Sequence, residues 1–600
     1  MKRALSLILC AVMLLSALCG CTTLEKDESG EYDKGAIIPM YLGTQMYNFD
    51  PAVAYLNDSN VKILSLLYTG LTDIDENGKL QMSLIDSYEI IDGNRYGEYK
   101  MQITLKNTKW SDGTAVTAKD VVYAWKRILD VDYDSEAAAL LYDIKNARAV
   151  KAGDMTIDDL GLTAPETLVV EVEFERSIDY DQFLRNLASP ALVPLREDIV
   201  SKSADWAKKP STMVTSGPFT VKAVTYGGVL RLERSNYYFL DKEKNEYLDK
   251  YVIPYRIETD YSQNLSAQLS KFSGSYLFYL NELPLDQRKT YKEQYGENIT
   301  TADLMSTHCY YFNLNNELFQ DARVRKALSL VIDREYIAND IVVFAKAATG
   351  FIPYGVTNGK AGTSWRDSGE ALIATTANLD AAKALLKEAG VSGGDIKINY
   401  YADDDVSGAI ASYIAGAWGQ LGFNVKTVAS KATVNSEDST LYTDVFNSLY
   451  NVSRAEGLNW DVLAVDYQAL SEEAFSALAP FALEFSGNGI NLSSDSNDYS
   501  FVGHVTGYNS EAYNAIIERA YEETDLTKRA EILREAESLL MEDMPVMPIV
   551  FNQNAYITNS KVVDGFKLDY YGTSIFDKVK MSDYMAWKPL FDTTQAAPAE

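Results

Sequence analysis

The sequence predicts a mixed α/β fold divided into two or more lobes. The chain has 600 residues, which is more than a single compact hydrophobic core usually serves. Segments with the alternating pattern of strands are interleaved with segments of helical spacing, without a repeat period, as in mixed α/β lobes. Hydrophobic residues make up 47% of the chain and charged residues 23%, a balance typical of globular proteins.

The stretch from residue 99 to 129 contains both patterns. Tyr99–Leu105 alternates between apolar and polar side chains, which predicts a half-buried strand. Asp112-Gly113 predicts a turn, because glycine tolerates positive φ. Thr117 and Asp120 form a capping box at the start of a helix, and the apolar residues that follow at helical spacing are Val121, Val122, Trp125, Ile128 and Leu129.

The second half of the chain contains further predicted elements of both kinds. Residues 310–315 read as a strand, and Asp321 as the N-cap of the next helix. Asp380–Ala389 predicts a helix that Gly390 ends. Leu526–Met541 predicts an amphipathic helix, and residues 544–551 a return to extended structure.

Charge and rare residue types exclude several classes of function. The 85 acidic and 55 basic side chains give a formal charge of −30, which argues against nucleic-acid binding because phosphate contacts need clustered basic residues. His308 and His504 are the only histidines, and Cys309 is the only cysteine after residue 21. A disulfide framework, a zinc site and a histidine-based catalytic triad are therefore disfavoured, and we expect neither a metal nor a cofactor, and no enzyme activity.

The N-terminus has the features of a lipoprotein signal peptide. Lys2 and Arg3 precede the uncharged run Ala4–Leu18, which is shorter than the roughly 20 residues that a membrane-spanning helix needs. Leu18-Cys19-Gly20-Cys21 resembles the lipobox of bacterial lipoproteins, in which the last cysteine is acylated. We expect residues 1–20 to be removed, Cys21 to carry the lipid, and residues 21–35 to tether the protein to the membrane.

Several motifs occur in an order that resembles the bacterial extracellular solute-binding proteins of family 5, which include oligopeptide- and dipeptide-binding lipoproteins of ABC importers. The matching segments are Asn48-Phe49-Asp50-Pro51, Leu66–Leu71, Trp110–Arg127, Ser216–Phe219 with Asn236-Tyr237-Tyr238, Tyr311–Arg334, and Ala382–Gly390. Each is short, but together they extend over most of the chain, from about Asn48 to about Phe566.

The resemblance implies a two-lobed clamp of the type II periplasmic-binding-protein kind, with an extra inserted domain. The implied divisions are lobe I (residues 36–70, 201–307 and 541–600), inserted domain II (71–200) and lobe III (308–540). It also implies a monomer on the extracytoplasmic face of the membrane, which captures an oligopeptide between its lobes and delivers it to the permease subunits of an ABC transporter.

The resemblance further implies two ligand-binding segments. The first corresponds to residues near Tyr55 and Asn57, and the second to Asp466-Tyr467, where the aspartate of the family holds the α-ammonium of the peptide. The family's Gly-Trp pair and following proline are missing here, and a gapless alignment places Leu470 at the acidic position, which leaves Glu472 or Glu473 as alternative anchors.

Two alternatives stay open at this point. The ligand could be another small solute, such as a signalling peptide, an opine, a sugar or a metal chelate. A secreted hydrolase is the alternative from another class, with Asp403-Asp404-Asp405 as conceivable acid and base. Three adjacent carboxylates cannot all face one substrate, so the hydrolase is the weaker hypothesis.

Overall fold

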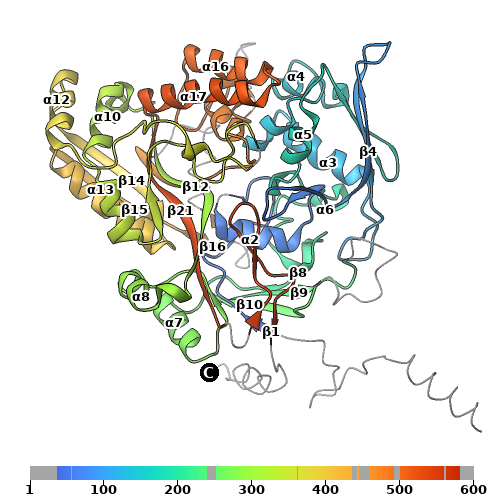
Figure 1. Ribbon diagram of the computed structural model, residues 1–600, viewed down its shortest axis with the longest axis horizontal. Coiled ribbons are helices and arrows are strands. Elements are labelled where there is room, and N and C mark those ends of the chain that lie inside the picture. Colours follow the sequence, from blue (N-terminus) through green and yellow to red (C-terminus); the bar gives the residue numbers. More distant parts are fainter. Residues whose placement is uncertain are drawn as a thin grey trace, which may run out of the picture.

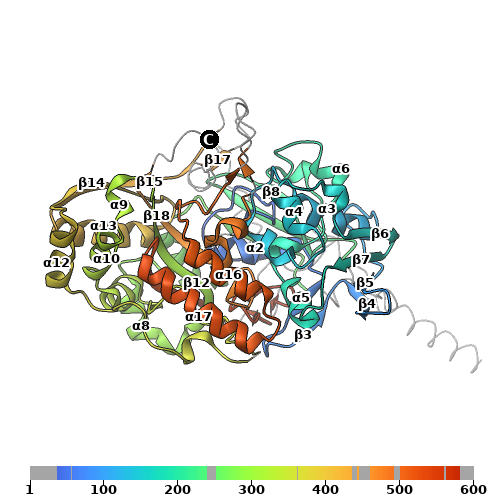
Figure 2. The same cartoon turned by 90° about the horizontal axis from the view of Figure 1, so that it is seen from above.

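A computed structural model of the chain shows a two-lobed α/β clamp (Figures 1 and 2). The structure describes residues 37–581 except 56, 239–251, 361, 435–441, 445–459, 489, 492–499 and 560–562. The predicted signal peptide, Cys21 and the tether at 21–35 lie outside the described residues. Helix α2 (Asp58–Leu67) lies near the centre of both views, between the two lobes.

The segments that the sequence assigns to lobe I and to domain II each contain a four-stranded sheet. The sheet of lobe I has the order β1 (Ile37–Pro39), β10 (Arg256–Asp260), β9 (Val229–Arg234) and β8 (Phe219–Val224). The sheet of domain II has the order β4 (Ile85–Asp92), β5 (Tyr99–Leu105), β7 (Val169–Phe174) and β6 (Leu162–Glu166). Its helices are α3 (Ala118–Leu129), α4 (Ala147–Lys151), α5 (Tyr180–Asn186) and α6 (Glu197–Val200).

A larger sheet is seven-stranded and mixed. The main strand order is β11 (Tyr279–Leu280), β21 (Val546–Thr558), β12 (Thr300–Phe312), β18 (Val462–Gln468), β14 (Gly394–Tyr401) and β15 (Phe423–Ser430), and β13 (Ala345–Ala347) pairs with β21. The helices around it are α7 (Leu265–Ser273), α8 (Arg288–Tyr295), α10 (Ala322–Leu330), α12 (Leu379–Ala389), α13 (Asp405–Gly419), α16 (Glu511–Glu522) and α17 (Leu526–Asp543).

The positions of the long strands β12 and β21 do not coincide with the predicted domain boundaries. The predicted border between residues 307 and 308 falls inside β12, and the border between 540 and 541 falls inside α17. The sequence assigns residues 541–600 to lobe I, whereas β21 pairs with β12 in the large sheet. The segmentation into lobes stays a prediction, and the continuous sheet suggests that β12 and β21 pass from one lobe to the other.

Most predicted elements are present at the expected residues. The strand β5 and the capping box of Thr117 and Asp120 before α3 are confirmed, as are the cap at Asp321 and the end of α12 at Gly390, which has a φ of 73°. The strand predicted at 310–315 is displaced: β12 ends at Phe312, because the side chain of Asn313 accepts a hydrogen bond from the amide of Asn315 and closes a turn.

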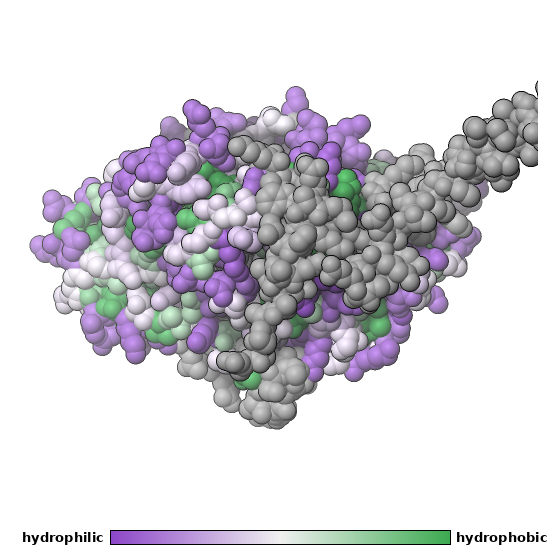
Figure 3. Space-filling model, turned by 90° about the horizontal axis from the view of Figure 1, so that it is seen from below, coloured by the Kyte–Doolittle hydropathy of each residue, from purple (hydrophilic) through white to green (hydrophobic). Residues whose placement is uncertain are grey.

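The distribution of hydrophilic and hydrophobic side chains on the surface agrees with the amino-acid composition. On the face shown in Figure 3, hydrophilic side chains cover much of the area, and hydrophobic ones lie in small separate groups between them. Among the residues that the structure describes, no helix is both long and apolar enough to cross a membrane.

Glu537 on α17 is a buried charge that ties together three parts of its lobe. Its side chain is 2% exposed and forms an ion pair with Arg366. One carboxylate oxygen accepts hydrogen bonds from the amides of Phe351 (2.8 Å) and Ile352 (2.9 Å), and the other accepts one from Trp365 Nε1 (2.7 Å). Removing this carboxylate would leave a buried guanidinium and several donors without their acceptor.

We therefore predict that Glu537→Ala lowers the free energy of unfolding by roughly 3–5 kcal/mol, because it leaves the buried charge of Arg366 without its partner. Glu535→Ala on the same helix is the matched control, since its ion pair with Arg519 is about half exposed on both sides and should contribute less than about 1 kcal/mol. Chemical unfolding followed by circular dichroism measures both. Equal losses in the two variants would contradict the assignment.

Candidate ligand-binding site

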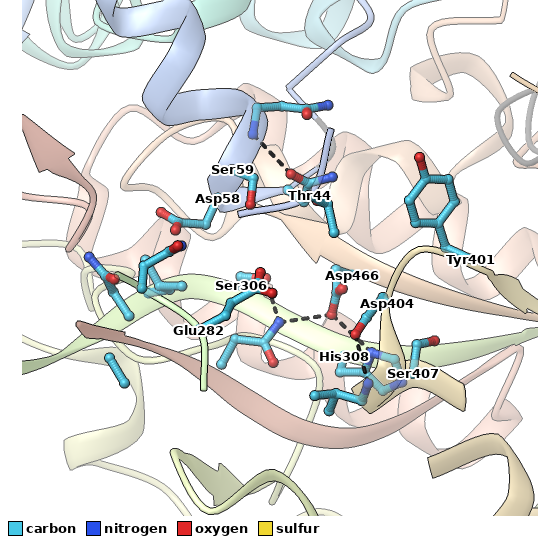
Figure 4. Close-up of a pocket in the computed structure, with 18 of the residues that line it drawn as sticks. Thr44, Asp58, Ser59, Glu282, Ser306, His308, Tyr401, Asp404, Ser407 and Asp466 are labelled. Atoms are coloured by element: carbon cyan, nitrogen blue, oxygen red, sulfur yellow. Dashed lines mark hydrogen bonds and ion pairs between the residues drawn. The ribbon is translucent and has the colours of Figure 1, made fainter. Parts of the chain in front are cut away.

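A cavity of about 490 Å³ lies between the segment that carries α2 and the large sheet (Figure 4). Residues 44–48 and 57–60 form one wall. Strands β12, β18 and β21 form the opposite wall, together with the loop after β11 and the start of α13. The volume falls in the range of roughly 300–1,000 Å³ that is usual for small-molecule sites.

The strand β18 exposes a free edge to this cavity. Along one side it pairs with β12 over its full length, from Val462 to Gln468. Along the other side it pairs with β14 only at Val462 and Leu463. Ala464, Val465 and Asp466 line the cavity, and no strand in the described part of the chain pairs with their outer edge. An extended ligand could therefore add to the sheet at this point.

Asp466 presents its carboxylate at the cavity wall. Its side chain is 32% exposed, and Oδ1 accepts hydrogen bonds from His308 Nδ1 (2.9 Å) and Asn552 Nδ2 (2.9 Å). The amide of Asn552 also donates to Ser306 Oγ, 2.9 Å away. Burial would raise the pKa of Asp466, but the charge of His308 and these hydrogen bonds lower it overall. Asp466 is therefore a carboxylate anion held in a fixed direction.

His308 is the partner that sets this direction. Burial alone would lower the pKa of His308, but the charge and hydrogen bond of Asp466, together with the charge of Asp404, raise it. The residue is 3% exposed, and its Nε2 forms no hydrogen bond within the described part of the chain. His308 and Asp466 face each other directly in the β12–β18 register.

Asp404 is a second carboxylate at this end of the cavity, and Figure 4 shows it beside Asp466 and His308. It caps α13 by accepting a hydrogen bond from the amide of Val406 at 2.9 Å. Burial and the charge of Asp466 raise the pKa of Asp404. Two neighbouring carboxylates with one histidine leave this end with excess negative charge.

Asp58 and Glu282 lie to the left of Asp466 in Figure 4, toward the other end of the cavity, and Arg288 also lines the cavity. Asp58 forms an ion pair of 2.5 Å with the buried Lys62. Arg288 is 7% exposed, and its guanidinium donates to the carbonyls of Leu283 (2.8 Å) and Val342 (3.2 Å). Burial and the charge of Asp404 raise the pKa of Glu282 to about 7.

The structure brings two of the four predicted ligand-binding residues to the cavity. Asp466 and Asn57 line it, and Asn57 also caps α2 through a hydrogen bond from the amide of Asn60. Tyr55 and Tyr467 are buried behind the wall instead. Tyr467 points away from the cavity because neighbouring strand residues point to opposite faces. Its hydroxyl donates to the carbonyl of Ser476, and its ring packs on Phe351.

Glu472 and Glu473, the alternative anchors for the ammonium, form ion pairs away from the cavity. Glu472 forms an ion pair with Arg185 at 2.7 Å, and Glu473 forms one with Arg529 at 3.0 Å. Neither glutamate lines the cavity. Of the three acidic residues weighed from the sequence, Asp466 alone is placed to meet a ligand there.

Sequence reasoning missed His308, Asn552, Asp404 and Glu282 as parts of the site. One signal was available: His308 is one of only two histidines and directly precedes the run Cys309–Phe312 at the end of its strand. The other three residues come from separate elements, and only the folded chain shows that they share one cavity.

Comparisons with known proteins agree with this architecture. The profile of the bacterial extracellular solute-binding proteins, family 5, matches residues 80–489. The chain is 26% identical over 570 residues to the dipeptide-binding protein DppE of Bacillus subtilis, with 92% of this chain and 94% of DppE covered. It is 27% identical over 578 residues to the oligopeptide-binding protein OppA of the same organism, with 93% and 95% covered.

The fold has a solved counterpart. The murein tripeptide binding protein MppA of Escherichia coli superposes with a TM-score of 0.74 at 21% identity, over 92% of this chain and 99% of MppA. The relatives are binding proteins for transport and not enzymes, so the hydrolase hypothesis is wrong. With the profile covering well over half of its length, the chain belongs to the bacterial extracellular solute-binding proteins of family 5.

Proposed function

We propose that this protein captures peptides in the cavity between its lobes and delivers them to the permease of an ABC importer. The observation that carries the proposal is the free edge of β18 beside a fixed carboxylate. The names of the relatives DppE and OppA support a peptide as ligand.

The strand edge suits the main chain of a peptide. A buried amide without a hydrogen-bond partner costs about 1–3 kcal/mol, so a site for peptides must supply backbone partners. Ala464, Val465 and Asp466 offer their outer edge to an extended ligand, as an added strand requires. Pairing of this kind depends little on the ligand's side chains. A sugar has no repeating amides that could add to the sheet as a strand.

Asp466 then fixes the register by holding the α-ammonium of the peptide. Its anionic oxygens accept hydrogen bonds only, and they lie at the end of the free edge of β18. An ammonium can add a charge-assisted hydrogen bond to them. The amide of Asn552 steadies the carboxylate from the other side.

We predict that Asp466→Asn weakens the binding of tri-alanine by roughly 2–5 kcal/mol, because a buried ammonium loses its counter-charge. Isothermal titration calorimetry measures the dissociation constant. Asp395→Asn is the control, since Asp395 is an exposed aspartate on β14. N-acetylated tri-alanine, which lacks the ammonium, should bind wild type and Asp466→Asn with similarly low affinity. An unchanged constant for Asp466→Asn would eliminate the assignment while leaving peptide capture open.

The His308–Asp466 pair gives this binding a pH dependence. In the free protein, the raised pKa of His308 means that its ion pair stabilises the fold below the unfolded pKa of about 6.5, and that this stability is lost as pH rises through the folded pKa. The ligand's ammonium competes with the His308 proton for Asp466, so binding expels that proton. Asp404 faces the same histidine and acts in the same direction as Asp466.

Affinity for tri-alanine is therefore expected to rise with pH through the folded pKa of His308 and to fall above about pH 8, where the α-amino group loses its own proton. Calorimetry across this range, in buffers of different ionisation enthalpy, measures both the affinity and the released proton. His308→Asn should flatten the rising limb. A rising limb that survives in this variant would show that another group is responsible.

Membrane attachment through Cys21 forms the second part of the proposal. The support is the lipobox-like Leu18–Cys21 directly after an apolar run. An acylated cysteine and a polar tether would hold a monomeric receptor close to its permease on the extracytoplasmic face. We predict that Cys21→Ser shifts the protein from the membrane fraction to the soluble extracytoplasmic fraction and abolishes incorporation of labelled fatty acid. Cys19→Ser is the control and should leave both properties unchanged.

A further inference from the structure

The end of the cavity opposite Asp466 contains several hydrogen-bond acceptors without donors. Glu282 follows β11 and lines the cavity, as Asp58 does (Figure 4), and no described donor hydrogen-bonds its carboxylate. Asn281 beside it also lines the cavity, and its Oδ1 is buried without a partner. Unsatisfied acceptors inside a protein are costly, so their presence at a cavity indicates a missing donor.

Asn554 on β21 supplies an independent observation. It lines the cavity and is 3% exposed. Its Nδ2 donates to the carbonyl of Gly572 (2.9 Å) and to Ser574 Oγ (3.0 Å), which fixes the orientation of the amide because a carbonyl can only accept. Its Oδ1 is left without a donor. The neighbouring Thr573 hydrogen-bonds Asp58, which places Asn554 at the same end as Asp58.

The charged residues around Glu282 also favour a cationic ligand. Asp58 is neutralised by Lys62, and Asp466 by His308. Arg288 and, to a smaller extent, Lys62 oppose the negative charge of Glu282, and Arg288 also acts on Asp404. One guanidinium thus serves two carboxylates. It is also committed to the carbonyls of Leu283 and Val342, so it reduces the negative charge of this end without removing it.

We propose that Glu282, Asn281 and Asn554 form a second, cation-selective subsite, so that this protein prefers peptides that carry a lysine or arginine side chain in addition to their α-ammonium. The inference rests on the proposed capture of peptides. An ammonium or guanidinium offers several N–H donors to the unpaired oxygens of these three residues, and its charge balances the excess carboxylate. A ligand carboxylate would instead be repelled by Glu282 and Asp404.

The experiment compares peptides that differ only in this charge. Ala-Lys-Ala and Ala-Ala-Lys are each paired with the analogue in which norleucine, of nearly the same shape, replaces lysine. Calorimetry measures affinity and proton release for wild type, Glu282→Gln and the control Glu293→Gln, which removes an exposed charge from α8. We expect wild type and the control to favour at least one lysine peptide by about tenfold or more, and Glu282→Gln to reduce that preference to less than about threefold.

Proton release gives a second readout that does not depend on affinity alone. Asp58, Lys62, Arg288 and Asp404 set the protonation of Glu282 in the free protein, and burial holds its pKa at about 7. A bound cation lowers that pKa, so near pH 7 the lysine peptide should expel more protons than its norleucine analogue. This difference should vanish in Glu282→Gln, whereas the proton released from His308 is common to both peptides.

The outcomes separate the two proposals. If all of these peptides bind, and lysine and norleucine peptides bind equally or Ala-Glu-Ala binds more tightly than Ala-Lys-Ala, the second subsite is wrong and peptide capture stands. If a lysine preference persists undiminished in Glu282→Gln, the assignment to Glu282 is wrong. If none of the peptides binds to protein freed of ligand, both proposals fail.

Discussion

The antiparallel pairing of β12 with β21 is the constraint on which the site depends. Both strands are 13 residues long, and β18 and β13 add to them. Their buried side chains belong to the lobe's core, while Ser306, His308 and Asn552 line the cavity. The same backbone hydrogen bonds therefore hold the lobe together and fix the positions of the polar groups in the wall.

Irregular pairing places these groups. Between Asp303 and Thr307 the register with β21 shifts, so that extra residues of β12 lie opposite Asn552. Such a bulge re-aims side chains, and here Asn552 reaches both Ser306 and Asp466. A second shift at His308 and Cys309 brings Pro548 into the ladder. Pro548 has no N–H to donate, so a regular ladder could not continue through it.

Local patterns in the sequence predicted the elements, and the resemblance predicted the clamp. The capping box at Thr117 and the glycine stop at Gly390 act over a few residues, so they can be read directly. Asp466 was reachable through a motif, whereas the side chain of its neighbour Tyr467 lies in the core, because successive strand residues point to opposite faces. Asp404, Glu282 and Asn554 lie in three separate segments, and no local pattern reports that a cavity will unite them.

The two ends of the cavity make different demands on a ligand. At the Asp466 end, His308 pairs with Asp466 in the free protein, and under the proposed function an incoming ammonium takes its place. At the Glu282 end, burial and the neighbouring carboxylates outweigh the opposing charges of Arg288 and Lys62. With a pKa of about 7, Glu282 is partly protonated in the free protein near neutral pH. A neutral ligand would leave that state largely unchanged, whereas a cation would favour the anionic form of the carboxyl group and be attracted to it. Main-chain pairing along β18 would hold any peptide, and the charge at the far end would discriminate among them.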